Sequence, residues 1–485
     1  MRILHISTRL ILGGSQENTV LSCEGQARRG HDVHLAFGPI YGPEGSLLER
    51  VQAFRTADGR GITTHVIPNM IRAVNPLADW RALRETKALI RDLMPNVVHT
   101  HSSKAGIIGR AAAWEKRSHH IGGSSWNDLN RNAGRMIVDP VLAAAAGEDM
   151  DETKLCDAWI DTAVVHTIHG PPFMPVEGGP LARARTRASN LLYTLAERTA
   201  ARRCHAIVSV ADAMTEQFLA RGIGNPAQYT TVYSGMEVEP FLTPAPGESK
   251  GEVRARLGLA PTDLVIGTVA RLAQHKGHDD LLAALADDLK QHPDRKLLWV
   301  GDGWWRARLL ARARTLGLSI RELDREPPPS SPSHPLTASP SQLLLTGLVP
   351  PERIPGLIRA MDILVHPSYR EGLPRTVPQA LLSGVVPVAY DADGTREVCR
   401  DLETGRLIPV GDLDALRGAV DWLALRPGAR HMLAARGRRF CQSRFSADRM
   451  VDELLRLYER ILAAGTPGPA AAEPADAADR AGAPA

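Results

Sequence analysis

The sequence has few cysteines, no long apolar run and little excess of charge of either sign. Its five cysteines are scattered without CxxC or other metal-like spacing, which argues against a zinc module and favours reduced thiols in a cytoplasm. No stretch of about 18 apolar residues occurs, so we expect no membrane-spanning helix. Arg9 interrupts the apolar N-terminus and no small-residue cleavage site follows, so we expect no signal peptide. The formal net charge of +4 is small for 485 residues and does not argue for nucleic-acid binding.

The length exceeds what one hydrophobic core supports, so we expect two or three domains. Short apolar runs, such as RILHIS (2–7) and VVHTH (97–101), alternate with helical stretches such as Pro76 to Leu93. This alternation predicts an α/β fold in which helices cover both faces of a parallel sheet. The pattern restarts after residue 260, which predicts a second domain of similar build behind a linker near 235–251.

We therefore place one Rossmann-like domain at residues 1–240 and a second at 241–446, followed by a helix at 447–464 that packs back toward the first domain. Three segments do not fit the alternation. Residues 114–162 and the Pro/Ser-rich residues 319–341 are interpreted as insertions, the latter as a mobile surface loop. The low-complexity tail at 465–485 is expected to be disordered.

The stretch GGSQEN (13–18) follows the first predicted strand and opens a helix. Gly13 and Gly14 would let backbone N–H groups approach an anion at the positive end of that helix, although an ordinary turn is the alternative. The stretch is not GxGxxG, and no acidic residue ends the second strand. Both features argue against an NAD site.

Polar side chains follow two further strands, in VVHTHSSKAG (97–106) and VVHTIHGPPF (164–173). His101, Lys104 and His169 stand at carboxyl ends of strands, where an open α/β sheet binds its ligand. Loop packing and helix capping are the alternatives. A metal site made of His166 and His169 is disfavoured, because residues three apart in a strand project to opposite faces.

Two cations stand beyond a strand of the second half, in GTVARLAQHKG (267–277). The planar Arg271 guanidinium can donate two parallel hydrogen bonds and Lys276 adds a point charge, which together suit a pyrophosphate. Solvated surface charge is the alternative. In SYREGLPRTVPQALLSG (368–384), Glu371 precedes a helix start. Its carboxylate can accept hydrogen bonds from sugar hydroxyls while the helix end takes phosphate, although an acid that only caps the helix is the alternative.

In this order the motifs resemble retaining glycosyltransferase family 4, over roughly residues 1–112 and 163–464. The resemblance implies the GT-B architecture, in which two Rossmann-like domains face each other across a cleft. The first would be the acceptor side, and the second would bind a nucleotide sugar. Polysaccharide-type bacterial members are the most similar group.

The resemblance also implies roles for the matching residues. Arg271 and Lys276 would contact the donor pyrophosphate, and the Gly13–Gly14 loop would close on it from the other domain. Glu371 would bind the transferred sugar near the amides of Gly372, Leu373 and Pro374, and His169 would lie against that sugar at the reacting centre. His101 and Lys104 would face the acceptor.

Gln379 departs from the family pattern, which has a second Glu there to bind the ribose hydroxyls. Gln keeps an acceptor oxygen, so we expect ribose contact at a loss of roughly 1 kcal/mol. The exchange also motivates the main alternative, a non-catalytic nucleotide-sugar-binding protein. A GT-B nucleotide-sugar epimerase is a further alternative.

The expected activity is transfer of a hexose-type sugar from a nucleoside diphosphate to a glycan or lipid-linked acceptor in envelope polysaccharide synthesis. We expect no metal, no cofactor, no nucleic-acid partner and a cytoplasmic location. A predicted basic helix could contact the inner membrane face peripherally, with a solvated face as the alternative. Its six arginines are Arg183, Arg185, Arg187, Arg198, Arg202 and Arg203.

Overall fold

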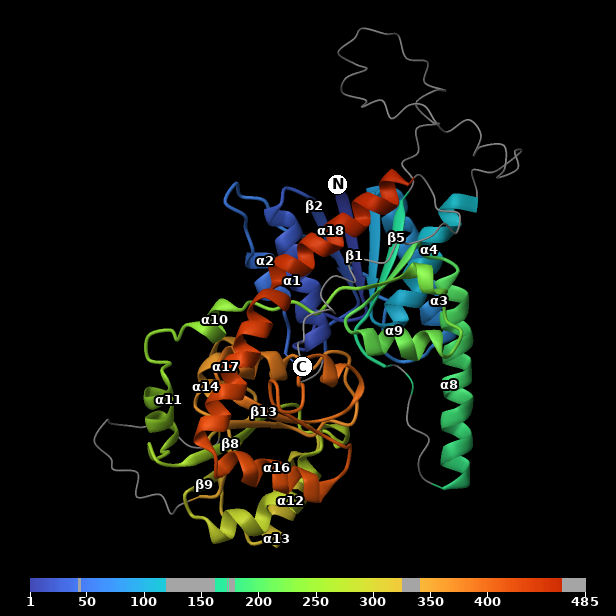
Figure 1. Cartoon of the computed structure of the whole chain (residues 1–485). Helices are drawn as coiled ribbons and strands as arrows, with labels where there is room; N and C mark the ends of the chain where they lie inside the picture. The colour runs from blue at the N-terminus through green and yellow to red at the C-terminus, as the bar shows by residue number, and fades with distance from the viewer. Residues whose placement is uncertain (42–44, 119–161, 172, 174–178, 325–340, 465–485) are drawn as a thin grey trace, which may run out of the picture.

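The computed structural model describes residues 1–41, 45–118, 162–171, 173, 179–324 and 341–464. Two parallel seven-stranded sheets, each flanked by helices, form two domains that lie one above the other in Figure 1. The predicted α/β fold with two Rossmann-like domains is therefore confirmed. The tail at 465–485 and most of both predicted insertions lie outside the described residues.

The first sheet has the strand order β3-β2-β1-β4-β5-β6-β7. Its strands are β1 (Arg2–Ser7), β2 (Asp32–Phe37), β3 (Thr63–Val66), β4 (Val97–His101), β5 (Ala163–Ile168), β6 (Ala206–Ser209) and β7 (Tyr229–Thr231). Its helices are α1 (Gly14–Arg28), α2 (Leu48–Ala53), α3 (Pro76–Leu93), α4 (Ser103–Ser118), α8 (Pro180–Ala201) and α9 (Asp212–Leu219). Strands β4 and β5 are buried throughout, because helices cover both faces of the sheet and the buried His and Thr side chains of these strands pair with one another.

The second sheet has the strand order β10-β11-β9-β8-β12-β13-β14. Its strands are β8 (Leu264–Val269), β9 (Arg295–Val300), β10 (Ile320–Glu322), β11 (Leu343–Leu345), β12 (Ile363–His366), β13 (Val386–Tyr390) and β14 (Arg406–Ile408). Its helices are α11 (Lys250–Leu257), α12 (His278–Gln291), α13 (Arg306–Thr315), α14 (Ile354–Arg359), α15 (Thr376–Leu382), α16 (Leu413–Ala424) and α17 (Pro427–Arg444). Short 3₁₀ turns are η1 (Pro226–Gln228), η2 (Gln274–Lys276), η3 (Pro351–Arg353) and η4 (Asp393–Glu397).

The structure corrects both predicted insertions at their edges. Residues 114–118 are not inserted but form the last turn of α4. Residues 320–322 are not a surface loop but form β10, which pairs in parallel with β11 along Leu343–Leu345. The expected strand pattern is absent from β10 because it is a three-residue edge strand with polar residues.

The chain returns to the first domain at its C-terminal end. Helix α18 (Ala447–Ala463), drawn red in Figure 1, crosses in front of the blue N-terminal elements and packs on α1. Met450, Val451 and Leu454 join Ile3 and Leu21 in one buried cluster.

The chain also crosses between the domains after β7, through α10 (Glu239–Leu242). The two crossings lie side by side, because the Met236 N–H donates to the Phe445 carbonyl at 2.9 Å and the Ala447 N–H donates to the Met236 carbonyl at 2.9 Å. None of the helices in the described ranges combines the length and the hydropathy that crossing a bilayer requires.

Candidate active site

A cavity of about 1030 Å³ lies between the domains, where the carboxyl ends of both sheets meet. Loops after β1, β4 and β5 line it from the first domain, and loops after β8, β9 and β12 line it from the second. We call it the interdomain cavity. The predicted site residues that line it are Gly13, Gly14, His169, Arg271, Lys276, Glu371, Gly372, Leu373 and Pro374.

Glu371 is held in the interdomain cavity by two basic side chains. Lys276 Nζ forms an ion pair with its Oε1 atom, and His366 Nε2 lies 2.9 Å from the same oxygen. Burial alone would raise the pKa of this carboxyl, but Lys276 and His366 outweigh burial and lower the pKa of Glu371 below its ordinary value. Glu371 is therefore an ionised hydrogen-bond acceptor at neutral pH.

The loop that carries Glu371 is fixed by the other domain. The Glu371 N–H donates to Asp393 Oδ2 at 2.7 Å, and Gln217 of α9 donates to the second oxygen of Asp393 at 2.5 Å. A side chain at Gly372 would collide with the His169 carbonyl, so only glycine permits this close approach between the domains. Arg370 Nη2 donates across the same boundary to the Pro171 carbonyl at 2.5 Å.

His169 lies in the loop after β5, and its Nε2 atom is 3.0 Å from His101 Nδ1. Burial and the nearby charge of Arg375 lower the pKa of His169 to about 3. The imidazole is therefore neutral, which suits a hydrogen-bonding role better than a charge-bearing one. Arg271 enters from the loop after β8, with its guanidinium 5.7 Å from the centre of the Trp304 ring.

Arg375 is a lining residue that sequence reasoning missed. Its Nη1 atom lies 2.7 Å from Glu17 Oε2 and donates to the Gly14 carbonyl at 3.3 Å, so it bridges the two domains. Its Nε and Nη2 atoms are buried, and neither has a hydrogen-bond partner among the described residues. The side chain is 9% exposed. Solvent reaches neither atom, so an anion in the cavity can use these two donors once the side chain turns toward it.

A signal for Arg375 was present in the sequence. The residue is the N-cap of the seven-residue helix α15, where the helix dipole disfavours a cation. A positive side chain at such a position gains nothing from its own helix, so it indicates a contact with another part of the chain or with a ligand.

Three predicted site residues do not line the interdomain cavity: His101, Lys104 and Gln379. His101 is 1% exposed, beneath His169. The Lys104 ammonium is held by the Ala73 carbonyl and by Asp79 Oδ1, which lies 2.6 Å away. Gln379 is buried within α15. The structure does not bring these three side chains to the cavity lining, and the acceptor contacts of His101 and Lys104 and the ribose contact of Gln379 stay predictions.

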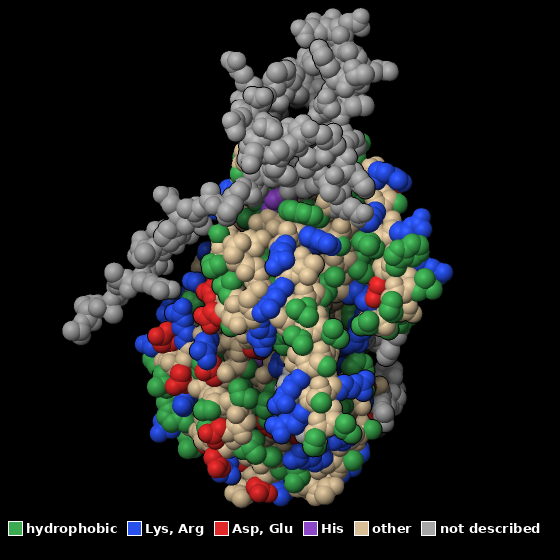
Figure 2. All heavy atoms as spheres, turned by 90° about the vertical axis from the view of Figure 1, so that its right-hand side faces the viewer, with side chains coloured by type: hydrophobic (Ala, Val, Ile, Leu, Met, Phe, Trp, Pro, Cys, Tyr) green, Lys and Arg blue, Asp and Glu red, His purple; other side chains and the backbone are tan. Residues whose placement is uncertain are grey.

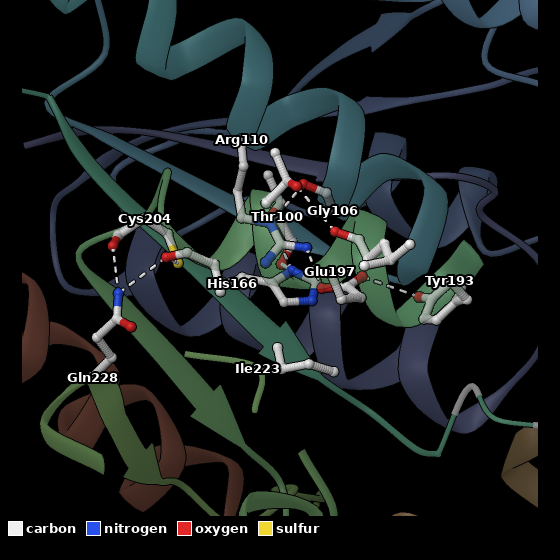
Figure 3. A network of polar contacts seen from close by, with 12 residues as sticks. Thr100, Gly106, Arg110, His166, Tyr193, Glu197, Cys204, Ile223 and Gln228 are labelled. Atoms are coloured by element: carbon white, nitrogen blue, oxygen red, sulfur yellow. Dashed lines mark hydrogen bonds and ion pairs between the residues drawn. The ribbon is translucent and has the colours of Figure 1, made fainter. Parts of the chain in front are cut away.

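A buried ion pair of the first domain, drawn in Figure 3, lies beside the lining of the interdomain cavity. Arg110 Nη2 of α4 donates to Glu197 Oε2 of α8 at 2.7 Å, and Tyr193 donates to Glu197 Oε1 at 3.1 Å. Tyr193, Glu197 and His166 line the cavity, and Arg110 is fully buried. Sequence reasoning missed Tyr193 and Glu197, because neither follows a strand.

The fold and this cavity can be compared with known proteins. Residues 13–235 match the family described as "Glycosyl transferase 4-like domain", and residues 263–425 match "Glycosyl transferases group 1". The chain belongs to these glycosyltransferases. Between them, the two matches include the loops from both domains that line the interdomain cavity, so the candidate site of this glycosyltransferase lies between the two matched regions.

Curated relatives are similar over most of the glycosyltransferase chain. The UDP-Gal:alpha-D-GlcNAc-diphosphoundecaprenol alpha-1,3-galactosyltransferase of Escherichia coli is 22% identical, over 87% of this chain and 87% of the relative. The putative glycosyltransferase EpsD of Bacillus subtilis (strain 168) is 23% identical, over 78% and 80% of the two chains.

Solved structures share the GT-B fold of the glycosyltransferase. Sucrose-phosphate synthase from Thermosynechococcus elongatus superposes with a TM-score of 0.68 at 17% identity, covering 96% of this chain and 100% of that chain. Anabaena Alr3699/HepE, solved in complex with UDP and glucose, superposes with a TM-score of 0.66 at 18% identity, covering 95% and 100%.

Proposed function

We propose that this glycosyltransferase moves a hexose-type sugar from a nucleoside diphosphate to a glycan or lipid-linked acceptor, retaining the anomeric configuration and without a metal. The observation that carries the proposal is the grouping of three cations and one ionised carboxylate in the interdomain cavity. Arg271, Lys276 and Arg375 suit a diphosphate, and Glu371 suits sugar hydroxyls. The relative from Escherichia coli is named for its UDP-Gal donor, which supports a nucleotide sugar as the donor here.

In the proposed reaction, the bond between the anomeric carbon and the phosphate oxygen breaks while the acceptor oxygen bonds to the same face of that carbon. The acceptor proton passes to the departing diphosphate. Negative charge grows on the diphosphate, and fixed cations stabilise it without reorganising. Glu371 orients the sugar, and the contacts between the domains exclude water that would hydrolyse the donor.

The proposal is tested by measuring transfer and donor hydrolysis with a panel of nucleotide sugars, chosen by the rise in melting temperature that each produces. We expect Arg271→Ala to abolish turnover, because the developing charge then loses a fixed cation. Arg417→Ala is the matched control, since Arg417 is on α16 and is 54% exposed. Activity should persist in excess chelator. Unchanged turnover in Arg271→Ala would reject the assigned role of this cation.

We also propose that the enzyme works in the cytoplasm at the inner membrane face, in envelope polysaccharide synthesis. Helix α8 carries exposed leucines beside exposed arginines, on the face of the molecule that Figure 2 turns toward the viewer. Leu191 and Leu192 are 59% and 69% exposed. Apolar and cationic side chains on one helix are typical of contact with anionic lipid. The exposed arginines at and after α8 are Arg183, Arg185, Arg187, Arg198, Arg202 and Arg203.

Co-sedimentation with vesicles tests the membrane contact. We expect binding to vesicles that contain an anionic lipid, weaker binding at high salt, and loss of binding when Arg183, Arg185 and Arg187 are changed together to Glu. Sedimentation that does not depend on anionic lipid would contradict this contact and leave the transferase proposal untouched.

A further inference from the structure

A chain of hydrogen-bonded side chains runs from the last turn of α1 to the interdomain cavity. Gln26 Oε1 lies 2.7 Å from His5 Nε2, and His5 Nδ1 lies 2.9 Å from His101 Nε2. His101 Nδ1 lies 3.0 Å from His169 Nε2. Gln26, His5 and His101 are at most 1% exposed, whereas His169 lines the cavity. The three histidines and Gln26 are therefore one connected unit.

The direction of each hydrogen bond in this chain follows from its first member. An amide oxygen can only accept, so the His5 proton is on Nε2 and its Nδ1 is a lone pair. His101 must then donate from Nε2 and accept at Nδ1, so His169 must donate from Nε2. The Nδ1 atom of His169 is left as a lone pair, and none of the described residues donates to it.

Burial keeps these rings in the neutral form that this reasoning requires. It lowers the pKa of His5 to about 4 and holds the pKa of His101 well below its ordinary value. A neutral imidazole carries one proton, so fixing the hydrogen bond at one nitrogen fixes the other.

Helix α18 sets the orientation of Gln26. The Nε2 group of Gln26 donates to the hydroxyl of Tyr458 on α18 at 3.3 Å, and that hydroxyl lies 2.5 Å from His99 Nδ1. The amide is thereby turned so that its oxygen faces His5. The residue that starts the chain is thus fixed by the helix that returns from the second domain.

We propose that Gln26, His5 and His101 are positioning residues that hold His169 in its Nε2–H tautomer, so that Nδ1 accepts a hydrogen bond from a sugar hydroxyl in the interdomain cavity. A lone pair at this point attracts a hydroxyl and repels a phosphate oxygen, so it distinguishes the sugar from the diphosphate. The tautomer follows from the contacts and the burial of the rings, whereas the sugar as its ligand rests on the proposed function.

A metal site is the competing interpretation of the same residues. Nitrogen atoms of His5, His99 and His101 lie within 4.8 Å of one another. However, both ring nitrogens of each of these histidines already have a hydrogen-bond partner, including Thr167 Oγ1 at 2.6 Å from His99 Nε2. A bound ion would have to break these bonds, so the hydrogen-bonded chain accounts for the cluster better.

The tautomer is measured by nitrogen NMR on the full chain with ¹⁵N-labelled histidine, using His169→Gln to assign the His169 signals. We expect a protonated Nε2 and an unprotonated Nδ1 in the ligand-free protein. Gln26→Met should give a mixture of tautomers at His169. Ser22→Ala is the matched control, because Ser22 lies one turn earlier on the same buried face of α1 and should leave the signals unchanged. A protonated Nδ1 in the wild type, or an unchanged tautomer in Gln26→Met, overturns the proposal.

Tyr458→Phe provides a second variant if Gln26→Met does not fold, since it frees the Gln26 amide to turn and should also mix the tautomers. Zinc titration separates the competing interpretation: one ion bound per chain and lost in His5→Gln would overturn the hydrogen-bonded chain. UDP-, GDP- and ADP-hexoses are then each compared with the matching free diphosphate. The hexose compound that binds should shift the Nδ1 signal, and the free diphosphate should not. A shift with the diphosphate alone would overturn the sugar contact and leave the tautomer result standing.

Discussion

Arg375→Met should separate the stability of the protein from its affinity for nucleotides, with effects of opposite sign. In the ligand-free protein the guanidinium buries Nε and Nη2 without partners. Each such group destabilises by about 1 kcal/mol or more. The ion pair between Arg375 and Glu17, whose side chain is 31% exposed, stabilises the fold by at most about 1 kcal/mol. We therefore expect the free energy of unfolding of the variant to stay level or to rise by about 1 kcal/mol.

Nucleotide binding should respond in the opposite direction. Two charge-assisted hydrogen bonds from Nε and Nη2 to a phosphate contribute about 1.5 kcal/mol each or more. Losing both weakens affinity by about 3 kcal/mol, which is roughly 100-fold. Arg375→Lys keeps the charge but not the paired N–H donors of the guanidinium, so we expect an intermediate loss of nucleotide affinity.

Calorimetric titration with UDP, GDP and ADP, together with thermal melts with and without each, measures both effects. Glu17→Gln is the matched control, because it removes the ion pair and keeps the guanidinium, so it should not weaken binding. A variant Arg375→Met that melts several degrees lower while binding the diphosphate as tightly as the wild type would refute the reasoning. Arg375 would then be a structural contact between the domains.

Lys276→Met should lower kcat by about 10²–10³-fold and raise the pKa of Glu371, because the ion pair that stabilises the Glu371 charge is lost. The pH dependence of kcat in the transfer assay measures both effects. Glu397→Gln should cost about 1 kcal/mol in urea unfolding, because the carboxylate accepts from two N–H groups at the start of α9 at 2.9 and 3.0 Å; an unchanged midpoint would contradict this cap. Acid should already lower the free energy of unfolding below about pH 6.5. His5 has an ordinary pKa near 6.5 when unfolded and about 4 when folded, so its stabilisation is complete above about pH 6.5 and falls by about 1.4 kcal/mol per pH unit toward pH 4. A melting temperature that is flat over that range would contradict the depressed pKa.

The sequence predicted the centre of each sheet better than its edges. The central strands β2 and β4 could be predicted, because a strand covered on both faces is rich in apolar and β-branched residues, as in DVHLAF and VVHTH. No apolar run marks β3, β7 or β10, which stand at the edges of the two sheets. They are three or four residues long and only partly buried, and their residues are mostly polar. No periodic pattern can develop over that length, so pairing with a neighbouring strand alone defines them.

Site residues, like strands, could be predicted where a local pattern fixes their position and not where long-range packing does. Residues directly after strands, such as His169 and Arg271, could be placed at the interdomain cavity from their position, because parallel strands bring their carboxyl ends together. Lys104 follows a strand as well, but Asp79 of α3 draws its ammonium away from the cavity. Glu197 lies on a helix and reaches the cavity only through its packing against α4. Such long-range contacts leave no local trace in the sequence.

The paired crossings at Met236 and Phe445–Ala447 have a mechanical consequence. The two chain segments connect the same two domains at one place. They therefore leave the domains little freedom to slide or twist against each other, and they act as a single hinge. Any widening of the gap between the domains must therefore swing about that point. Substrate would then enter and product would leave on the side remote from the hinge, while the returning C-terminal helix moves rigidly with the first domain.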